Sequence, residues 1–194
     1  MTFKKNHKSL IIKTLCLALP LSIEAQISNQ TTAVRITEQE VQLQDKYMAA
    51  VVQQQIGKLE GAATLFSEVL AKNPKCDGCA FQLSRLYTSM EKKQEAIDLA
   101  RVATKIDPQN KWYQMQLAES LERIGKDRDA ADVYRNLAEN KLFENDFSEE
   151  IYFRLAFAQV RMGEPQKAIK TLDELEKKTG VDEDISDKKH TIYD

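Results

Sequence analysis

The sequence predicts an all-α fold, an α-α superhelix (solenoid) of about four helix-turn-helix repeats. Three observations predict it. The chain is 42% hydrophobic and 30% charged, and Ala, Leu, Glu, Lys and Gln, which favour helices, dominate it. Small residues, glycines and prolines recur with one period of 34 residues. Between them, apolar residues follow one another at steps of three and four, as on one face of a helix.

The first 25 residues are expected to form a secretory signal peptide. Three lysines precede an apolar stretch from Leu10 to Ile23, and the small residue Ala25 shortly after it is the expected cleavage position. Lys13 interrupts this stretch, which is too short to span a bilayer. We therefore expect an exported protein of the periplasm, the cell envelope or the extracellular space.

The charge of the remaining chain argues against nucleic acid as a partner. Cleavage removes four of the 28 basic residues and one of the 30 acidic residues, which leaves 24 against 29 and a net charge of −5. Nucleic-acid-binding surfaces need clustered positive charge. Residues 26–36 follow as a polar, aperiodic segment, which we expect to be a flexible linker.

Helical structure is expected to begin at Thr37. Thr37 and Glu40 have the spacing of a capping box, in which the hydroxyl and the carboxylate each satisfy a backbone N–H that the first helical turn leaves unpaired. A helix that runs to about Gln55 should follow.

The 34-residue period organises the rest of the chain. The residues that share it are Ala62, Ala96 and Ala130, then Pro74 and Pro108, and, two periods apart, Gly57 and Gly125. Gly163 and Ala168 mark a fourth copy that is displaced by 38 residues, so four extra residues lie within 142–147. Each copy holds two amphipathic runs separated by a turn, which predicts a pair of helices. The prolines and turns exclude an uninterrupted coiled coil.

Small residues are predicted to bring the two helices of each copy together. On the first helices they are Ala50, Ser84, Ala118 and Ala156. Small side chains let two helix axes approach closely. Asp77, Asn110 and Ser148 stand where the next helix needs an N-cap. Gly180 is expected to end the last second helix.

A helix-turn-helix unit with this period and these Ala, Gly, large apolar and Pro positions resembles the tetratricopeptide repeat. The resemblance implies a domain of residues 37–180 with copies at about 43–76, 77–110, 111–148 and 149–182. It implies a superhelix whose concave side is lined by the first helix of each copy and receives a polypeptide segment. Residues 181–194 would then be a C-terminal cap or an incomplete further repeat.

The resemblance places partner-binding residues on the stripe of each first helix that does not face the second helix. Aromatic, Met and Arg side chains, which dominate many interfaces, are frequent there. The residues are Tyr47, Val51, Phe81, Arg85, Trp112, Met115, Glu119, Arg123, Phe153, Phe157 and Arg161. We expect an apolar or amphipathic protein segment as ligand. For the phenylalanines, packing between repeats is an equal alternative; Trp112, in a first turn, is the better candidate.

Cys76 and Cys79 lie at the turn between the first and second copies. In an exported protein a disulfide is chemically permitted, and a structural staple is the preferred interpretation over unpaired thiols. A redox pair would need a thioredoxin-like strand and helix, and no strand is predicted nearby. A metal site would need further ligands, and His190, the only histidine after residue 25, is far away in sequence.

No cofactor, metal or catalytic group of residues is predicted. Acidic pairs such as Glu149–Glu150 lack a nearby His, nucleophilic Ser or phosphate loop, and they suit the first turn of a helix. We expect a non-enzymatic scaffold that binds a protein partner, within an envelope assembly. Two alternatives stay open: a thiol-disulfide redox protein that uses Cys76 and Cys79, and a structural spacer within a longer chain.

Overall fold

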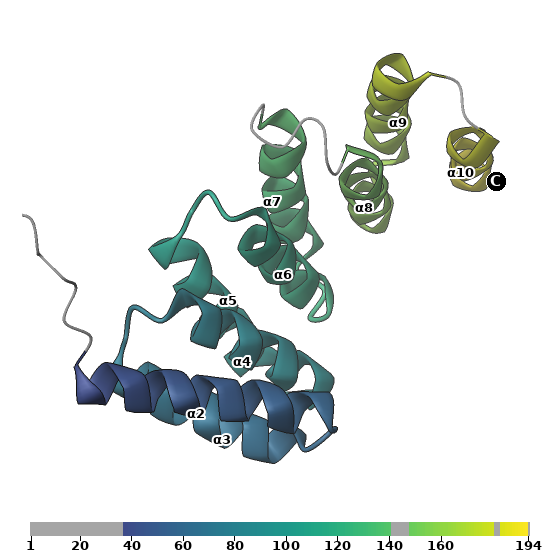
Figure 1. Ribbon diagram of the computed structural model, residues 1–194. Coiled ribbons are helices and arrows are strands. Elements are labelled where there is room, and N and C mark those ends of the chain that lie inside the picture. Colours follow the sequence, from purple (N-terminus) through teal and green to yellow (C-terminus); the bar gives the residue numbers. More distant parts are fainter. Residues whose placement is uncertain (1–36, 141–147, 181–182, 194) are drawn as a thin grey trace, which may run out of the picture. The chain divides into compact units, whose positions relative to one another are not determined.

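The structure is a computed structural model that describes residues 37–140, 148–180 and 183–193. These residues form helices and no strand, as predicted (Figure 1). In chain order the helices are α2 (Glu38–Gln55), α3 (Leu59–Lys72), α4 (Asp77–Ser89), α5 (Lys93–Ile106), α6 (Lys111–Glu122), α7 (Asp127–Glu139), α8 (Ser148–Arg161), α9 (Pro165–Thr179) and α10 (Glu183–Tyr193). The expected signal peptide, the linker 26–36 and the insertion within 142–147 lie outside the described residues.

Contacts divide the chain into two units, Met1–Val41 and Gln42–Asp194. The structure describes only residues 37–41 of the first unit, and they confirm the capping box. The backbone N–H of Thr37 donates to Glu40 Oε2 at 2.7 Å, and the Glu40 N–H donates to Thr37 Oγ1 at 3.2 Å. The hydrogen bond from the Thr37 backbone, followed by that from its hydroxyl, lowers the pKa of the Glu40 carboxyl.

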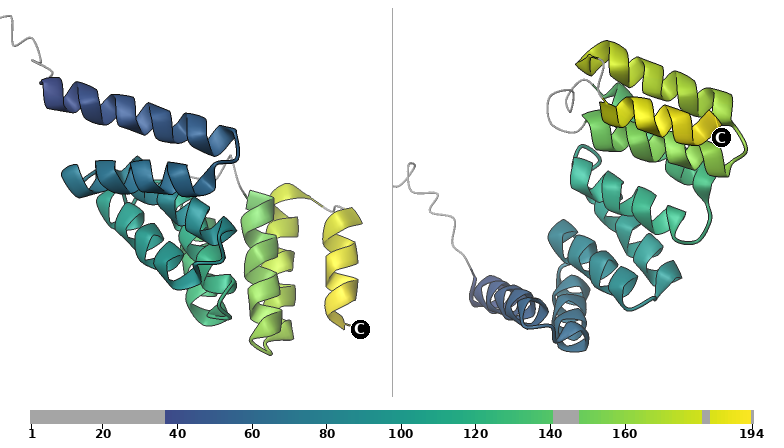
Figure 2. Two further views of the ribbon diagram at one scale, coloured as in Figure 1. Left: turned by 90° about the horizontal axis from the view of Figure 1, so that it is seen from below. Right: turned by 90° about the vertical axis from the view of Figure 1, so that its right-hand side faces the viewer.

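Within Gln42–Asp194 the helices pack as successive pairs. The pairs α4–α5, α6–α7 and α8–α9 each pack internally, and α3–α4, α5–α6 and α7–α8 contacts join one pair to the next (Figures 1 and 2). The predicted small residues are at most 2% exposed: Ala50, Ser84, Ala118 and Ala156 on the first helices, and Ala62, Ala96, Ala130 and Ala168 on the second helices. Small side chains therefore do lie where the helices approach, as the sequence predicted.

The turn inside each pair needs one residue with a left-handed backbone. Gly57, Gly125 and Gly163 have φ values of 78°, 74° and 75° in their turns. At the equivalent position of the second pair stands Glu91, the non-glycine residue with positive φ, at 58°. A side chain with a Cβ is strained in this conformation, so Glu91 marks a turn that glycine would suit better.

The predicted N-caps have different outcomes. Asn110 caps α6, because its side chain accepts a hydrogen bond from the Trp112 N–H at 3.1 Å. Asp77 is not the cap of α4: that helix begins at Asp77, and Cys76 precedes it as the N-cap. Ser148 is the first residue of α8. The prediction for Asp77 was wrong by one residue because an acidic side chain suits both the N-cap and the first turn.

The last pair continues into α10. Gly180 is the C-cap of α9 with φ of 93°, as predicted. α10 lies against the α8–α9 pair (Figure 2), and Ile185 is buried in a core cluster with Tyr152, Leu172 and Leu175. The described part of the C-terminal segment is thus a helix that covers apolar residues of α8 and α9.

Candidate protein-binding face

Side chains of consecutive first helices touch one another. On α2, Gln54 Nε2 donates to Gln82 Oε1 of α4 at 3.5 Å. On α6, Gln116 Nε2 donates to Thr88 Oγ1 of α4 at 3.1 Å. We call the surface that these helices share the first-helix face. The predicted binding residues come from these helices, namely Tyr47 and Val51 on α2, Phe81 and Arg85 on α4, Trp112, Met115, Glu119 and Arg123 on or next to α6, and Phe153, Phe157 and Arg161 on α8.

Two aromatic residues of the first-helix face are strongly exposed. Trp112 is 52% exposed in the first turn of α6, where the Asn110 cap fixes its backbone. Phe157 is 38% exposed in the middle of α8. Large apolar side chains with this exposure offer area that a ligand can remove from water.

Three other aromatic residues of the face are partly covered by the chain itself. The Tyr47 ring packs edge-on against Phe66, with ring centroids 5.3 Å apart. The Phe81 ring packs on Tyr113 at 5.0 Å. The Phe153 ring lies beneath Lys188 Nζ of α10, at 4.1 Å. For these rings, the alternative of packing within the molecule is at least partly realised. Val51 is likewise half-buried, against the cluster of α2, α3 and α4.

Met115 does not belong to the exposed face. It is 7% exposed and lies in the core cluster with Ile97, Ala118 and Leu121. The prediction was wrong for this residue because the contact between α5 and α6 buries one edge of the stripe. The 34-residue period alone cannot show how much of the α6 stripe the preceding helix α5 covers.

Arg161 is exposed but is engaged within the chain. Its Nε lies 2.6 Å from Asp127 Oδ1, and its Nη2 is hydrogen-bonded to Glu122. Arg154, which the sequence analysis missed, lies 3.2 Å from Glu119 and 3.4 Å from Glu122. These ion pairs connect α8 to α6 and to the first residue of α7. Arg161 therefore bridges two repeats, and its contact with a ligand stays a prediction.

Tyr134 of α7 completes this charged cluster. Its hydroxyl donates to Glu122 Oε2 at 2.8 Å. Burial, and then the negative charge of Glu122, raises the pKa of the Tyr134 hydroxyl far above its ordinary value. The hydroxyl therefore stays protonated and serves as a hydrogen-bond donor.

A polar pocket of about 200 Å³ opens on the first-helix face. Its polar lining comes from three helices: Gln54 of α2, Arg85, Thr88 and Ser89 of α4, and Gln116 and Glu119 of α6. Gln116 is 7% exposed, and its amide nitrogen also lies 3.2 Å from the hydroxyl oxygens of Ser84 and Ser120. Its register position, shared with Gln82 and Arg154, is polar in three copies, and this signal could have identified the contacts between first helices.

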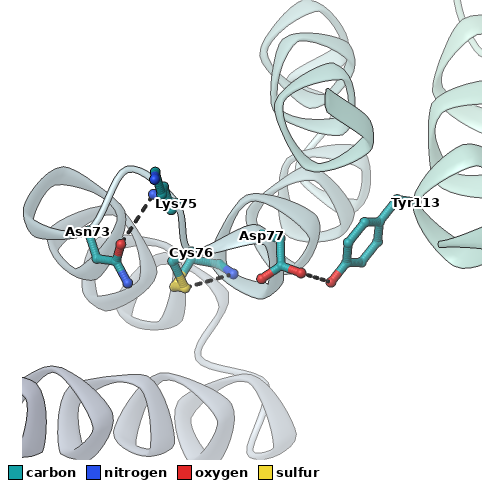
Figure 3. The surroundings of a disulfide bond; sticks show 6 residues. Asn73, Lys75, Cys76, Asp77 and Tyr113 are labelled. Atoms are coloured by element: carbon teal, nitrogen blue, oxygen red, sulfur yellow. Dashed lines mark hydrogen bonds between the residues drawn. A yellow bond between two sulfur atoms is a disulfide. The ribbon is translucent and has the colours of Figure 1, made fainter. Parts of the chain in front are cut away.

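A disulfide lies at the junction of α3 and α4 (Figure 3). Cys76 and Cys79 are bonded, with Cα atoms 5.2 Å apart, and the Cys79 N–H points at Cys76 Sγ at 3.2 Å. Asp77 between them accepts a hydrogen bond from the Tyr113 hydroxyl of α6 at 3.0 Å. Burial, followed by this bond, raises the pKa of Tyr113 to about 12. The disulfide thus closes the first turn of α4, and Asp77 links that turn to α6.

Within the described ranges, no helix is long and apolar enough to cross a membrane. No group of three or more His, Cys, Asp or Glu in these ranges is arranged to hold a metal ion.

Two regions of the chain match family models, each described as tetratricopeptide repeat. They are residues 79–110 and 150–178. Comparison with curated proteins gives no significant match.

Solved structures share the fold at low sequence identity. MamA protein superposes with a TM-score of 0.66 at 17% identity, over 78% of this chain and 80% of that chain. YrrB, described as a TPR protein with an unusual peptide-binding site, gives 0.63 at 17% identity, over 76% and 74%. Pseudomonas aeruginosa pilF gives 0.61 at 13% identity, over 77% and 67%. Identities this low show the fold alone. The chain therefore contains tetratricopeptide repeats, and its fold is the all-α helical superhelix that such repeats build.

Proposed function

We propose that this protein is a non-enzymatic scaffold that captures a segment of another protein along the first-helix face. The tetratricopeptide fold supports a protein or peptide partner. The observation that carries the proposal is the exposure of Trp112 and Phe157 on that face, at 52% and 38%. YrrB offers a precedent for peptide binding by such a fold.

The composition of the face indicates the chemistry of the ligand. Trp112 and Phe157 offer apolar area, and Arg85 and Arg123 are exposed cations beside the polar pocket and after α6. Arg123 lies 3.8 Å from the exposed Glu91, whereas Arg154 and Arg161 each face two or more carboxylates of the chain. We therefore expect a segment with apolar anchors and nearby acidic groups. Arginine and aromatic side chains at the centre of an interface contribute most of its free energy.

Trp112 provides a direct test because it is the only tryptophan of the chain. Proteins captured from an envelope extract are identified by mass spectrometry, and the recovered partner is titrated into the purified chain while Trp112 fluorescence is recorded. Binding at the face should shift the emission. Trp112→Ala and Phe157→Ala should each weaken binding by about 1–3 kcal/mol, measured by calorimetry.

Val102→Ala is the matched control, since Val102 is a 39% exposed apolar residue on the second helix α5. It should leave affinity unchanged, and far-UV circular dichroism should be the same for all variants. Equal affinity of the wild type and both aromatic variants would refute the proposal.

The cellular location is part of the proposal. The apolar stretch before Ala25 supports export to the periplasm or envelope, where the scaffold would join a multi-protein assembly. Mass spectrometry of the protein from its native cell should find Gln26 as the first residue. A first residue upstream of the apolar stretch, in protein recovered from the cytoplasm, would contradict export.

A thiol-disulfide redox function is the second candidate. The observation that favours it is the position of Cys76 at the N-cap of α4, because a helix N-terminus stabilises a thiolate. Against it, Cys79 is fully buried in the core. A reduction potential in the range of catalytic oxidants, with oxidase activity lost in Cys76→Ser, would favour this candidate over the scaffold.

A further inference from the structure

A second surface, on α2, carries apolar residues that are at least as exposed as Trp112 and Phe157 of the first-helix face. Met48, Val52 and Ile56 are 55%, 52% and 59% exposed, and they follow one another at four-residue steps along one edge of the helix and just past its end. We call these three residues the α2 edge. From Tyr47 to Ile56 the chain has no charged residue. Depletion of charge is typical of the centre of a protein interface.

The position of Val52 on this edge is buried in every other described first helix, whereas the position of Met48 holds the polar residues Gln82, Gln116 and Arg154. Val52 corresponds, through the 34-residue period and the four-residue insertion, to Leu86, Ser120 and Ala158. These residues are 2%, 2% and 0% exposed. Ile56 corresponds to half-buried residues, namely Met90, Ile124 and Met162. The difference at Val52 is therefore one of surroundings and not of position in the repeat.

A second helix of the preceding pair covers this edge in the other copies. α4 packs against α3, α6 against α5 and α8 against α7. Leu86 lies in one cluster with Ala63 and Phe66 of α3. Ala158 lies in one cluster with Ala131 and Tyr134 of α7. Each cover is an amphipathic helix with small and large apolar residues on the contacting face.

We propose that the α2 edge is a stacking surface for an amphipathic helix of another protein, bound as the second helix of a preceding pair would be. This surface is distinct from the first-helix face. The internal contacts between pairs define the expected ligand: a helix with Ala and large apolar residues on one face and little charge beside them.

Every described second helix already packs against other helices of the chain, so we do not expect a second copy to supply this helix. Among the described second helices, α3, α5 and α7 are followed by the next first helix, and α9 is covered by α10 through Ile185. Pairing of two α2 edges alone would bury three side chains from each copy, much less than the ~800 Å² per partner of a stable interface.

The probe for the test is a helix-stapled, fluorescein-labelled peptide with the sequence of α3, Leu59–Lys72, which covers the equivalent edge of α4. Its binding to the purified chain is followed by fluorescence anisotropy. Saturable binding is expected, and Val52→Lys combined with Ile56→Lys should weaken it at least tenfold.

Val102→Lys is the matched control. Val102 is exposed on α5, and its equivalents Glu68, Asn136 and Glu174 are exposed and polar, so this position faces solvent in every copy. It should bind the peptide as the wild type does, and so should Trp112→Ala, which separates this surface from the proposed ligand site. Met48→Lys serves as a further variant should the double variant lose helicity by circular dichroism.

Three results would overturn the proposal. They are no saturable binding to the wild type, the same affinity for wild type and α2-edge variants, and a loss of affinity caused by Trp112→Ala. A concentration-dependent dimer in light scattering that Val52→Lys abolishes would assign the edge to a second copy, and it would overturn the choice of another protein's helix.

Discussion

The last helix that the structure describes, α10, differs from the first, α2, in the charge of its residues and in how many of them are buried. α10 has five charged residues among eleven and turns one apolar residue, Ile185, into the core at 1% exposure. α2 has no charged residue from Tyr47 to Gln55, and Ala50 is its only buried residue. Solvated polar faces are what capping helices of repeat arrays need, because an open repeat exposes apolar surface. α10 has the character of a cap, whereas α2 has the residue pattern of an interior helix.

A helix that covers a repeat carries charged residues on its outer face, as α10 does, whereas the uncharged stretch of α2 is typical of a helix that another helix covers. α10 adds Lys189, whose Nζ lies 2.7 Å from Asp173 and 2.6 Å from Glu176 of α9. These contacts hold a charged helix against its neighbour. On α2 the corresponding role falls to the Tyr47–Phe66 contact and to the salt bridge of Lys46 with Glu68.

The largest expected effect comes from one substitution made at both ends. Ile185→Asp puts a carboxylate into the core cluster of α8, α9 and α10, and it should lower the free energy of unfolding by about 3 kcal/mol. Val52→Asp places the same group on an exposed edge, and it should change stability by less than about 0.5 kcal/mol. Urea denaturation measures both. Equal destabilisation by the two variants would break the distinction between the ends.

The turns between the ends offer a second, smaller test. Glu91→Gly relieves a left-handed backbone and should stabilise the protein by about 1 kcal/mol, while Gly125→Ala should destabilise it by a similar amount. A Cβ at Gly125 would meet no atom within 4 Å, so backbone conformation alone is tested. Thermal unfolding of both variants measures the effect. Destabilisation by Glu91→Gly would mean that the exposed Glu91–Arg123 contact, at 3.8 Å, outweighs the strain.

The ion pairs of the cap should contribute less. Lys189→Gln removes both contacts and should lower the free energy of unfolding by up to about 1 kcal/mol, with a smaller loss at high salt. Burial disfavours the charged amine, but the hydrogen bonds to Asp173 and Glu176 outweigh it and raise the pKa of Lys189 above 10.5. The stabilisation is therefore complete at neutral pH and is lost as pH rises through that raised value. Alkaline denaturation of wild type and Lys189→Gln should converge there.

The smallest effect is expected at the start of α2. The lowered pKa of Glu40 means that its contribution is present above pH 4.5 and is lost as pH falls through the folded-state value. Carboxyl chemical shifts in an NMR titration should give a pKa below 4.5, and Thr37→Ala should return it towards 4.5. A Glu40 pKa at or above 4.5 in the wild type would show that the capping box does not form in solution.

The sequence predicted the helices and their pairing well, and it predicted the candidate face less well. Asn110, Gly180 and the small residues stand where they were expected, because caps, turns and close helix contacts depend on one or two side chains at fixed spacing. Met115 was expected on the exposed stripe but is buried, and the pairing of Arg161 within the chain was not expected. Their exposure and pairing depend on residues 18 to 39 positions away, such as Ile97 and Glu122, which no local pattern specifies.

By itself, the sequence determined that this protein is a series of helix pairs, because a 34-residue period of small, apolar and turn residues can be buried in few other ways. Only the tertiary structure decided which stripes remain exposed. Val52 and Leu86 occupy the same place in the repeat, yet one faces water and the other the core. Burial is set by whether another helix packs alongside, and that is a property of neighbours and not of the residue.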